Sequence, residues 1–351
     1  MKSSVVKVLI VDDSALIRAL LSEVFKSDPS IEVCGSASDP YEARELIKQL
    51  SPDVLTLDIE MPKMNGITFL KNLMRLRPMP VVMISTLTQE GAPATLEALE
   101  LGAVDFVPKP KQQGADALAA YSDTICSKVK AAAKANIRQR LQDEGKDVPK
   151  PAVPAIKPSR SGYLCAIGAS TGGTEAIKEL ICGFPENCPP TVIAQHIPES
   201  FSASFAKRVD SQAAPNVYEA EHDQLIEVGG VYIAPGHSHL TIKKRGGQYY
   251  CHLDQSDPVN RHRPSVEVLF DSVSTIAGSN CSGVLLTGMG ADGAEALLRM
   301  RKAGALTVAQ DESSSVVWGM PGAAVAIDGA SKVLDLHKIA AVVLADCGRT
   351  Q

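Results

Sequence analysis

The first half of the 351-residue sequence alternates short apolar runs with segments whose apolar residues recur at helical spacing. Short apolar runs predict buried strands, and a period near 3.6 residues predicts amphipathic helices. The predicted strands are 5–11, 31–37, 54–57, 81–84 and 104–107, and the predicted helices are 14–26, 41–50, 67–75 and 91–101. Regular alternation of this kind predicts an α/β fold with a doubly wound, five-stranded parallel sheet.

Polar residues follow most of these strands, at the edge where ligands bind in open α/β sheets. They are Asp12, Asp13, Asp58, Ser85, Thr86 and Lys109. Three carboxylates at one edge repel one another unless a cation joins them, and their oxygen ligands suit Mg²⁺. Asp58 is then able to accept a phosphoryl group, whose charge Lys109 and the metal neutralise. Any one of these aspartates alone is more simply a helix cap or a loop residue.

Residues 5 to about 125 resemble a response-regulator receiver domain, which has a flavodoxin-like fold. The resemblance rests on the acidic pair, on the segment LDIEMPKMNG and on the lysine before Pro110. It implies phosphorylation of Asp58, with Mg²⁺ bound by Asp12, Asp13 and Asp58. The residues that it implies respond to phosphorylation are Ser85, Phe106 and Lys109, with Thr86 as an alternative to Ser85.

In the second half, the first predicted strand ends at a serine. Residues 164–168 are apolar or small, Ser170 follows, and a helical pattern begins near Thr174. The string GASTG fits G-x-S-x-G, in which small neighbours let a strand turn sharply into a helix and expose the hydroxyl group of a nucleophile. The alternative is a glycine-rich turn in which Ser170 or Thr171 caps the helix, or in which free N–H groups hold a phosphate.

Two further predicted strands end near residues that would complete a catalytic group. His196 follows the run TVIAQ, and Asp292 lies in a glycine-rich loop after the run SGVLLT. If the strands are parallel, both residues meet Ser170 at one edge. A serine hydroxyl needs a base to take its proton, and a carboxylate holds the imidazole of that base. Glycines around Met289 let a backbone N–H serve as an oxyanion donor.

The order serine, histidine, aspartate differs from the order in α/β-hydrolases, which argues against a lipase of that kind. The segments AIGASTGGTEAI, AQHIPESF, YIAPGHSHL, NRHRPSVEVLF, LLTGMGADGAEAL and AQDESSSVVWGMPGAA instead resemble the catalytic domain of the CheB family of chemotaxis protein-glutamate methylesterases. The resemblance covers almost all of residues 161–346.

This second resemblance implies Ser170 as nucleophile, His196 as general base and acid, and Asp292 as orienting carboxylate, with Met289 and Thr171 beside the oxyanion. It implies hydrolysis of glutamyl methyl esters, and deamidation of glutamines, on methyl-accepting chemotaxis receptors. The chemotaxis histidine kinase is the implied phospho-donor, and the catalytic domain needs no cofactor. The alternative function is a receiver-controlled nucleotide-binding or scaffold protein without hydrolase activity.

We expect a receiver domain at 1–130, a linker at 131–160 and a catalytic domain at 161–351. Residues 114–141 predict a helix, and four prolines between 149 and 158 then predict an extended spacer. Such a spacer permits the two domains to dock or to separate. Our hypothesis is that the receiver covers the serine until Asp58 is phosphorylated.

The amino-acid composition limits the classes of partner that the protein can bind and the cellular compartment in which it can act. A hydrophobic content of 45% fills two cores, and a net charge of −5 without a basic cluster argues against nucleic-acid binding. Eight scattered cysteines suit reduced thiols in the cytoplasm. No apolar run reaches the roughly 18 residues of a membrane span, so we expect no membrane insertion.

Two other polar groups have open interpretations. His237 and His239 stand two apart, as metal ligands on one strand face do, but a β-meander is the favoured interpretation. Its predicted strands are 231–234, 240–243 and 248–253. The basic cluster of Arg261, His262 and Arg263 either holds an acidic substrate helix or lies in a solvated loop.

Overall fold

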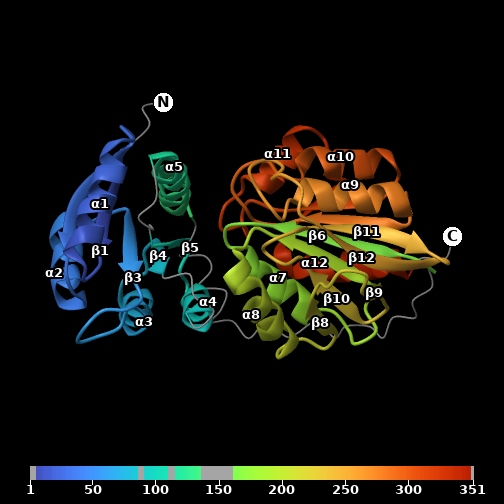
Figure 1. Cartoon of the computed structure of the whole chain (residues 1–351), viewed down its shortest axis with the longest axis horizontal. Helices are drawn as coiled ribbons and strands as arrows, with labels where there is room; N and C mark the ends of the chain where they lie inside the picture. Colours follow the sequence, from blue (N-terminus) through green and yellow to red (C-terminus); the bar gives the residue numbers. More distant parts are fainter. Residues whose placement is uncertain (1–4, 86–90, 110–114, 136–160, 349–351) are drawn as a thin grey trace. The chain divides into compact units, whose positions relative to one another are not determined.

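The computed structural model describes residues 5–85, 91–109, 115–135 and 161–348 (Figure 1). The chain divides into two compact units, residues 1–142 and 143–351. Most of the predicted linker 131–160 lies outside the described residues, so the predicted domain limits stay a prediction.

The first unit is built around a five-stranded sheet in which every strand pair is parallel, as predicted. Its elements are β1 (Val6–Val11), α1 (Ala15–Lys26), β2 (Ile31–Ala37), α2 (Pro40–Leu50), β3 (Val54–Asp58), α3 (Gly66–Leu76), β4 (Val81–Ser85), α4 (Ala92–Glu100), β5 (Asp105–Pro108) and α5 (Ala115–Ala132). The strand order is β2-β1-β3-β4-β5. This order reverses direction between β1 and β3, and ligands bind at such a switch point.

Local sequence explains where these helices begin. The side chains of Ser14, Asp39 and Asn65 accept hydrogen bonds from the first-turn N–H groups of α1, α2 and α3. Strands β3 and β4 are buried along their whole length, as expected for a sheet covered on both faces. The predicted helix 114–141 is shorter than expected, since α5 ends at Ala132, and residues 136–141 lie outside the described residues.

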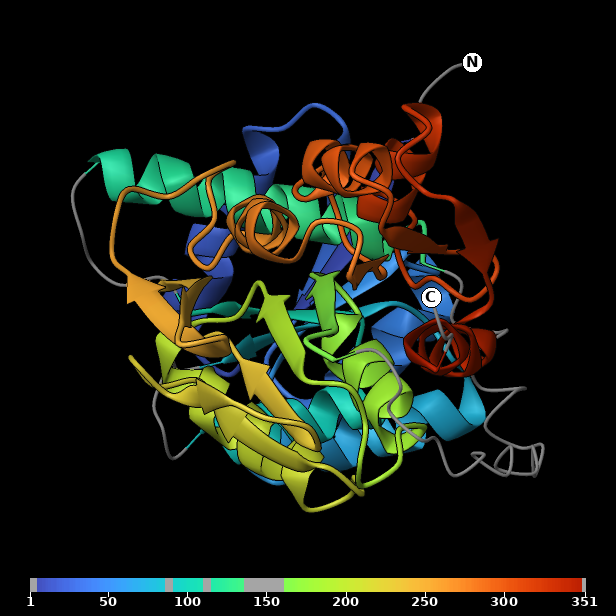
Figure 2. The ribbon, with the colours of Figure 1, turned by 90° about the vertical axis from the view of Figure 1, so that its right-hand side faces the viewer.

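The second unit contains a seven-stranded sheet in the order β15-β14-β13-β6-β7-β10-β8, with all pairs parallel. Its strands are β6 (Leu164–Ala169), β7 (Thr191–Gln195), β8 (Asn216–Glu219), β10 (Gly230–Ile233), β13 (Cys281–Leu285), β14 (Leu306–Gln310) and β15 (Lys332–Leu334). Figure 2 shows β6 and β7, coloured green, running side by side in the same direction. The carboxyl ends of β6, β7 and β13 are therefore neighbours.

Helices cover both faces of this sheet (Figure 1). On one side lie α9 (Val266–Ala277), α10 (Ala294–Lys302) and α11 (Met320–Ala326), and on the other lie α7 (Gly173–Cys182), α8 (Glu199–Asp210) and α12 (Leu336–Cys347). Buried side chains of α9, such as Leu269 and Phe270, pack with Val192 of β7 and Leu285 of β13 in one hydrophobic core. This packing places the first turn of α9 above the carboxyl ends of the central strands.

The antiparallel part differs in one strand from the predicted β-meander. A hairpin of β11 (His239–Arg245) and β12 (Gln248–Asp254) is present, but its third strand is β9 (Leu225–Ile226). The predicted strand 231–234 is instead β10, which pairs with β7 and β8 in the parallel sheet. A short apolar run carries no signal that separates a parallel from an antiparallel strand. No helix among the described residues has the length and apolar character needed to cross a membrane.

Candidate functional site

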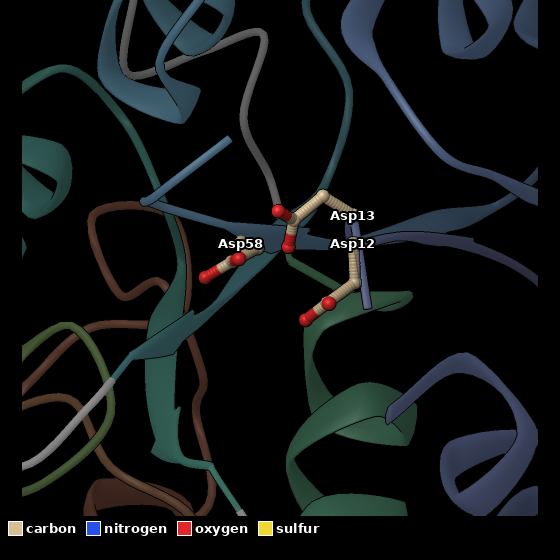
Figure 3. Close-up of side chains that lie close together, drawn as sticks. All are labelled: Asp12, Asp13 and Asp58. Carbon is tan, nitrogen blue, oxygen red and sulfur yellow. The ribbon is translucent and has the colours of Figure 1, made fainter. Parts of the chain in front are cut away.

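The first unit gathers Asp12, Asp13 and Asp58 at the switch point of its sheet. Their side chains lie close together at the ends of β1 and β3 (Figure 3). One carboxylate oxygen from each lies within 4.8 Å of the other two. Asp12 and Asp58 are each only 1% exposed, whereas Asp13 is exposed. The structure thus brings the three predicted ligands together.

Lys109 is the cation that faces these carboxylates. Its Nζ donates a hydrogen bond to Oδ2 of Asp58 at 2.7 Å and lies 3.4 Å from Oδ2 of Asp12. The pKa of Asp58 is raised to about 6, mainly by burial; the Lys109 ammonium opposes this rise, and the neighbouring Asp12 carboxylate adds to it. Burial also raises the pKa of Asp12. One ammonium group therefore does not satisfy the two buried carboxylates.

The donor set fits a magnesium ion. Oδ1 of Asp12 accepts the N–H of Ser14 at 2.8 Å, but Oδ2 is buried and has no hydrogen-bond donor. Mg²⁺ binds one or two carboxylates while keeping waters and phosphate oxygens as its other ligands. Two buried carboxylates beside an exposed third, with an oxygen that lacks a donor, are suited to that coordination.

The predicted switch residues lie on the neighbouring strands. Ser85 is 2% exposed, and its hydroxyl group lies 2.9 Å from Oγ1 of Thr95 on α4. Phe106 is 5% exposed, and Nζ of Lys128 lies 5.3 Å from the centre of its ring while donating to its carbonyl at 2.9 Å. Thr86, the alternative to Ser85, lies outside the described residues.

The second unit brings Ser170, His196 and Asp292 into one hydrogen-bonded chain. Oγ of Ser170 lies 3.1 Å from Nδ1 of His196, and Nε2 of His196 lies 2.8 Å from Oδ2 of Asp292. The carboxylate can only accept, so the ring carries its proton on Nε2 and presents the Nδ1 lone pair to the serine. This is the tautomer that a general base requires.

Asp292 is held by a dense set of donors. Oδ1 accepts from Nδ2 of Asn260 at 2.8 Å, from Oγ of Ser265 at 2.9 Å and from the N–H of Glu267 at 3.3 Å. Oδ2 accepts from the N–H of Val266 at 2.7 Å as well as from His196. Burial by itself raises the pKa of Asp292, but these hydrogen bonds and the charge interaction with His196 lower it to about 2. The carboxylate is ionised throughout the physiological range.

The turn after β6 is made by one of the small residues that follow the serine. Ser170 does not have a positive φ, and the left-handed residue is Gly172, at φ +75°. The Ser170 N–H donates to the carbonyl of Thr287 at 3.0 Å, so this group is occupied within the sheet. The glycine two positions later, not the serine, makes the reversal into α7.

The loop after β13 lies directly beside Ser170. A Cβ on Gly288 would lie 2.8 Å from Cβ of Ser170 and 2.4 Å from the sulfur of Met320, so only glycine fits. The Gly288 carbonyl accepts the N–H groups of Gly319 and Met320, which fixes the loop. Among the described residues the next N–H, that of Met289, has no acceptor, as an oxyanion donor requires.

Each half of the sequence matches a known protein family. Residues 165–343 match the family model described as CheB methylesterase, and residues 8–119 match the response regulator receiver domain. A protein-glutamate methylesterase/protein-glutamine glutaminase of Saccharophagus degradans is 62% identical over 97% of this chain and 98% of its own length. The chain belongs to the CheB methylesterase family.

Other CheB-family proteins extend this match. A protein-glutamate methylesterase/protein-glutamine glutaminase of Vibrio vulnificus is 53% identical over 97% of both chains. The crystal structure of the Thermotoga maritima CheB methylesterase catalytic domain is similar with a TM-score of 0.52 and 37% identity, covering 53% of this chain and 99% of that one. The parallel sheet described above is thus the CheB catalytic fold.

Within this CheB-family chain the basic cluster has a more specific arrangement than the sequence predicted. The backbones of Val259 and His262 pair in both directions around Asn260 and Arg261, which have φ values of +52° and +68°. This tight turn directs Asn260 to Asp292, as described, and stacks the His262 ring on that of His196 at a centroid distance of 3.6 Å. Arg263 donates to carbonyls of residues 255 and 256.

The histidine pair does not form a metal site in the described part of the chain. His239 is fully buried, its Nδ1 accepts the N–H of Ser265 at 3.1 Å, and its Nε2 lies 3.2 Å from the carbonyl of Asp257. His237 bonds instead to the hydroxyl group of Ser238. Within the described ranges, the acidic trio of the first unit is the one group of three or more metal-ligating side chains. The favoured hairpin interpretation of this region is correct in that β11 begins at His239.

Proposed function

We propose that this protein is a phosphorylation-activated protein-glutamate methylesterase that hydrolyses glutamyl methyl esters, and deamidates glutamines, on methyl-accepting chemotaxis receptors. The observation that carries the proposal is the hydrogen-bonded chain from Ser170 through His196 to Asp292 in a CheB-family protein. Relatives along the whole chain bear the name of both activities. We also propose that the protein acts in the cytoplasm, as its scattered cysteines lead us to expect.

In the proposed reaction, Oγ of Ser170 attacks the ester carbonyl while Nδ1 of His196 takes its proton. The new C–O bond gives a tetrahedral oxyanion, and the imidazolium that forms is stabilised by the ionised Asp292. Its collapse breaks the bond to the methoxy group, which leaves as methanol with the proton from His196. Water, activated by the same ring, then hydrolyses the acyl-serine and releases the glutamate carboxylate. A glutamine side chain follows the same path with ammonia as the leaving group.

The oxyanion needs donors that are fixed before the reaction. We assign the Met289 N–H to this task because it has no other acceptor and follows the glycine that contacts Ser170. Thr171 is proposed as the second oxyanion residue. It is 3% exposed, and its carbonyl accepts the hydroxyl group of Thr287 at 3.0 Å, which holds the turn against β13.

Regulation is proposed to begin at the acidic site. Asp12, Asp13 and Asp58 would hold Mg²⁺, whose charge would neutralise the oxygens of the incoming phosphoryl group. Asp58 would accept that group from the chemotaxis histidine kinase, and Lys109 would exchange its contact with Asp58 for a phosphoryl oxygen. Ser85 and Phe106 would respond to the change. We propose that the receiver, residues 1–130, then uncovers the catalytic domain, residues 161–351, through the linker 131–160.

The test of the esterase function is methanol release from a purified methylated chemoreceptor. We expect Ser170→Ala to reduce the rate by about 10⁴-fold or more, because the nucleophile is lost. Ser211→Ala, on an exposed residue at the end of α8, is the matched control and should leave the rate unchanged. Equal rates for Ser170→Ala and wild type would rule out the serine mechanism.

The test of regulation uses the full chain with a small phosphoryl donor such as acetyl phosphate. We expect the donor and Mg²⁺ together to raise the methanol-release rate of the wild type and to leave that of Asp58→Asn unchanged. The fragment 155–351 should be faster than the unphosphorylated full chain. If the fragment is no faster, the receiver does not inhibit by covering the serine.

A further inference from the structure

The side chain of Gln195 joins the nucleophile to the base from behind. Gln195 is the last residue of β7 and immediately precedes His196. Its Nε2 donates to the carbonyl of Ser170 at 3.0 Å and to the carbonyl of His196 at 3.1 Å. A single amide group therefore holds the main chains of both residues.

Gln195 makes these two hydrogen bonds at the point where the backbone pairing of β6 with β7 ends. In the pairing of β6 with β7, Ala169 stands opposite Gln195, and the N–H of His196 donates to the Ala169 carbonyl at 3.1 Å. Beyond that point the chains diverge, one into the turn before α7 and the other toward α8. The two hydrogen bonds from Gln195 extend the link between the strands by one residue, to the pair that carries the hydroxyl group and the ring.

The surroundings of Gln195 favour the observed orientation of its amide. The residue is 3% exposed, and its Oε1 is buried without a hydrogen-bond donor. That oxygen faces the first turn of α7, since a Cβ on Gly173 would lie 2.2 Å from it. The positive end of the helix dipole favours an oxygen there, while the NH₂ group faces the two carbonyls. A reversed amide would place its oxygen against both carbonyls and lose the two hydrogen bonds.

We propose that Gln195 is a positioning residue that sets the distance between Oγ of Ser170 and Nδ1 of His196. The proposal rests on the proposed function only in taking Ser170 and His196 as nucleophile and base. It goes beyond that function because Gln195 touches neither substrate nor reacting atoms. Since misplacement of reacting groups by about 1 Å can reduce a rate by about 100-fold, loss of this link is expected to affect the reaction step.

The experiment measures fluorophosphonate labelling of the full-length protein. The second-order rate constant reports how well the histidine activates the serine, and the final labelled fraction reports how much protein is folded. The variants are Gln195→Met, which keeps the length of the side chain without donors, and Gln195→Glu, which replaces the two N–H donors of the amide with a carboxyl group that has at most one O–H donor. Gln212→Met, on an exposed glutamine, is the control. Ser170→Ala gives the blank.

We expect Gln195→Met and Gln195→Glu to lower the rate constant by 10-fold to 100-fold with the labelled fraction unchanged. In methanol release the same variants should lower kcat by a similar factor and leave KM within about twofold. A rate constant within twofold of wild type, or a smaller labelled fraction at the wild-type rate constant, would overturn the positioning role. Failure of the wild type to label at Ser170 is a separate result, which would overturn the serine mechanism itself and the role of Gln195 with it.

Discussion

Asp58 and Asp292 are buried carboxylates at the carboxyl ends of parallel strands, but their surroundings differ. Asp58 is 1% exposed and Asp292 4% exposed, and yet the pKa of Asp58 is raised to about 6 while that of Asp292 is lowered to about 2. The two values differ because burial dominates at the first site, whereas hydrogen bonds outweigh burial at the second.

The number of donors explains this difference. Asp292 accepts from three N–H groups or amides of its own unit, from a hydroxyl group and from the ring of His196. Asp58 has the Lys109 ammonium and a backbone hydrogen bond, and Asp12 stands against it with an oxygen that has no donor. The second unit therefore supplies Asp292 with all of its hydrogen-bond donors. The first unit leaves negative charge at Asp58 and Asp12 that a bound cation can neutralise.

Of the substitutions at these two carboxylates, Asp292→Asn is expected to have the larger effect, which is on catalysis. The amide cannot accept from all five donors and no longer holds the proton of His196 on Nε2. We expect kcat to fall by about 10³-fold to 10⁴-fold and the second unit to lose about 1 to 3 kcal/mol of unfolding free energy. Methanol release and urea unfolding measure the two effects. Asp257→Asn, on an exposed residue, should change neither.

The same substitution at Asp58 is expected to act in the opposite direction on stability. Removing a carboxylate whose pKa is raised to about 6 should stabilise the first unit at pH 7 by about 1 to 3 kcal/mol. Added Mg²⁺ should stabilise the wild-type unit and have a smaller effect on the variant. Asp123→Asn, exposed on α5, is the control. Destabilisation of the first unit by Asp58→Asn would show that its carboxylate is already satisfied without a ligand.

The pH dependence of unfolding sharpens the comparison. The stability that Asp292 contributes is present above its unfolded pKa of 3.8, and about 2 kcal/mol of it is lost as pH falls toward the folded pKa of about 2. The contribution of Asp58 to the unfolding free energy changes with pH in the opposite direction. It is present below pH 3.8 and is lost as the pH rises through about 6. Unfolding measured from pH 2 to 7, with each Asn variant as reference, separates the two. Parallel pH profiles for wild type and variant would contradict the assigned shifts.

The smallest expected effect concerns the ring stacked on the base. His262→Ala removes an aromatic contact worth about 0.5 to 1.5 kcal/mol, so we expect kcat to fall about threefold to tenfold. His262→Phe keeps a flat ring over His196 and should retain most of the activity. A loss in His262→Phe as large as that in His262→Ala would mean that the stack itself contributes little.

The sequence predicted the parts of this comparison that depend on strand ends. Alternating strands and helices bring Asp12, Asp58 and Lys109 to one edge, and the same rule brings Ser170, His196 and Asp292 together in the second unit. Parallel topology was enough to predict that each group shares one edge of its sheet. That β6 lies between β13 and β7, and that Lys109 reaches Asp58 from β5 across β4, is known only from the structure.

The supporting residues were beyond the reach of sequence reasoning. Asn260 and Ser265 reach Asp292 from a loop whose path depends on two left-handed residues and on the packing of α9. Gln195 belongs to a run that simply predicts a strand. The strand at 231–234 was assigned to the wrong sheet, because apolar runs do not specify their partners. The sequence did mark His262 as part of the basic cluster 261–263. Its stacking on His196, however, depends on the tight turn at residues 259–262, which the sequence does not predict.

The orientation of the His196 ring has a chemical consequence for inhibitors. An alkylating reagent that first binds to Oγ of Ser170 would then react with the His196 ring nitrogen nearest to that oxygen, which is Nδ1 in this protein. The two mono-alkylated imidazoles are distinct compounds that chromatography separates after acid hydrolysis. The isomer recovered from such an adduct would therefore record which edge of the ring had faced the hydroxyl group.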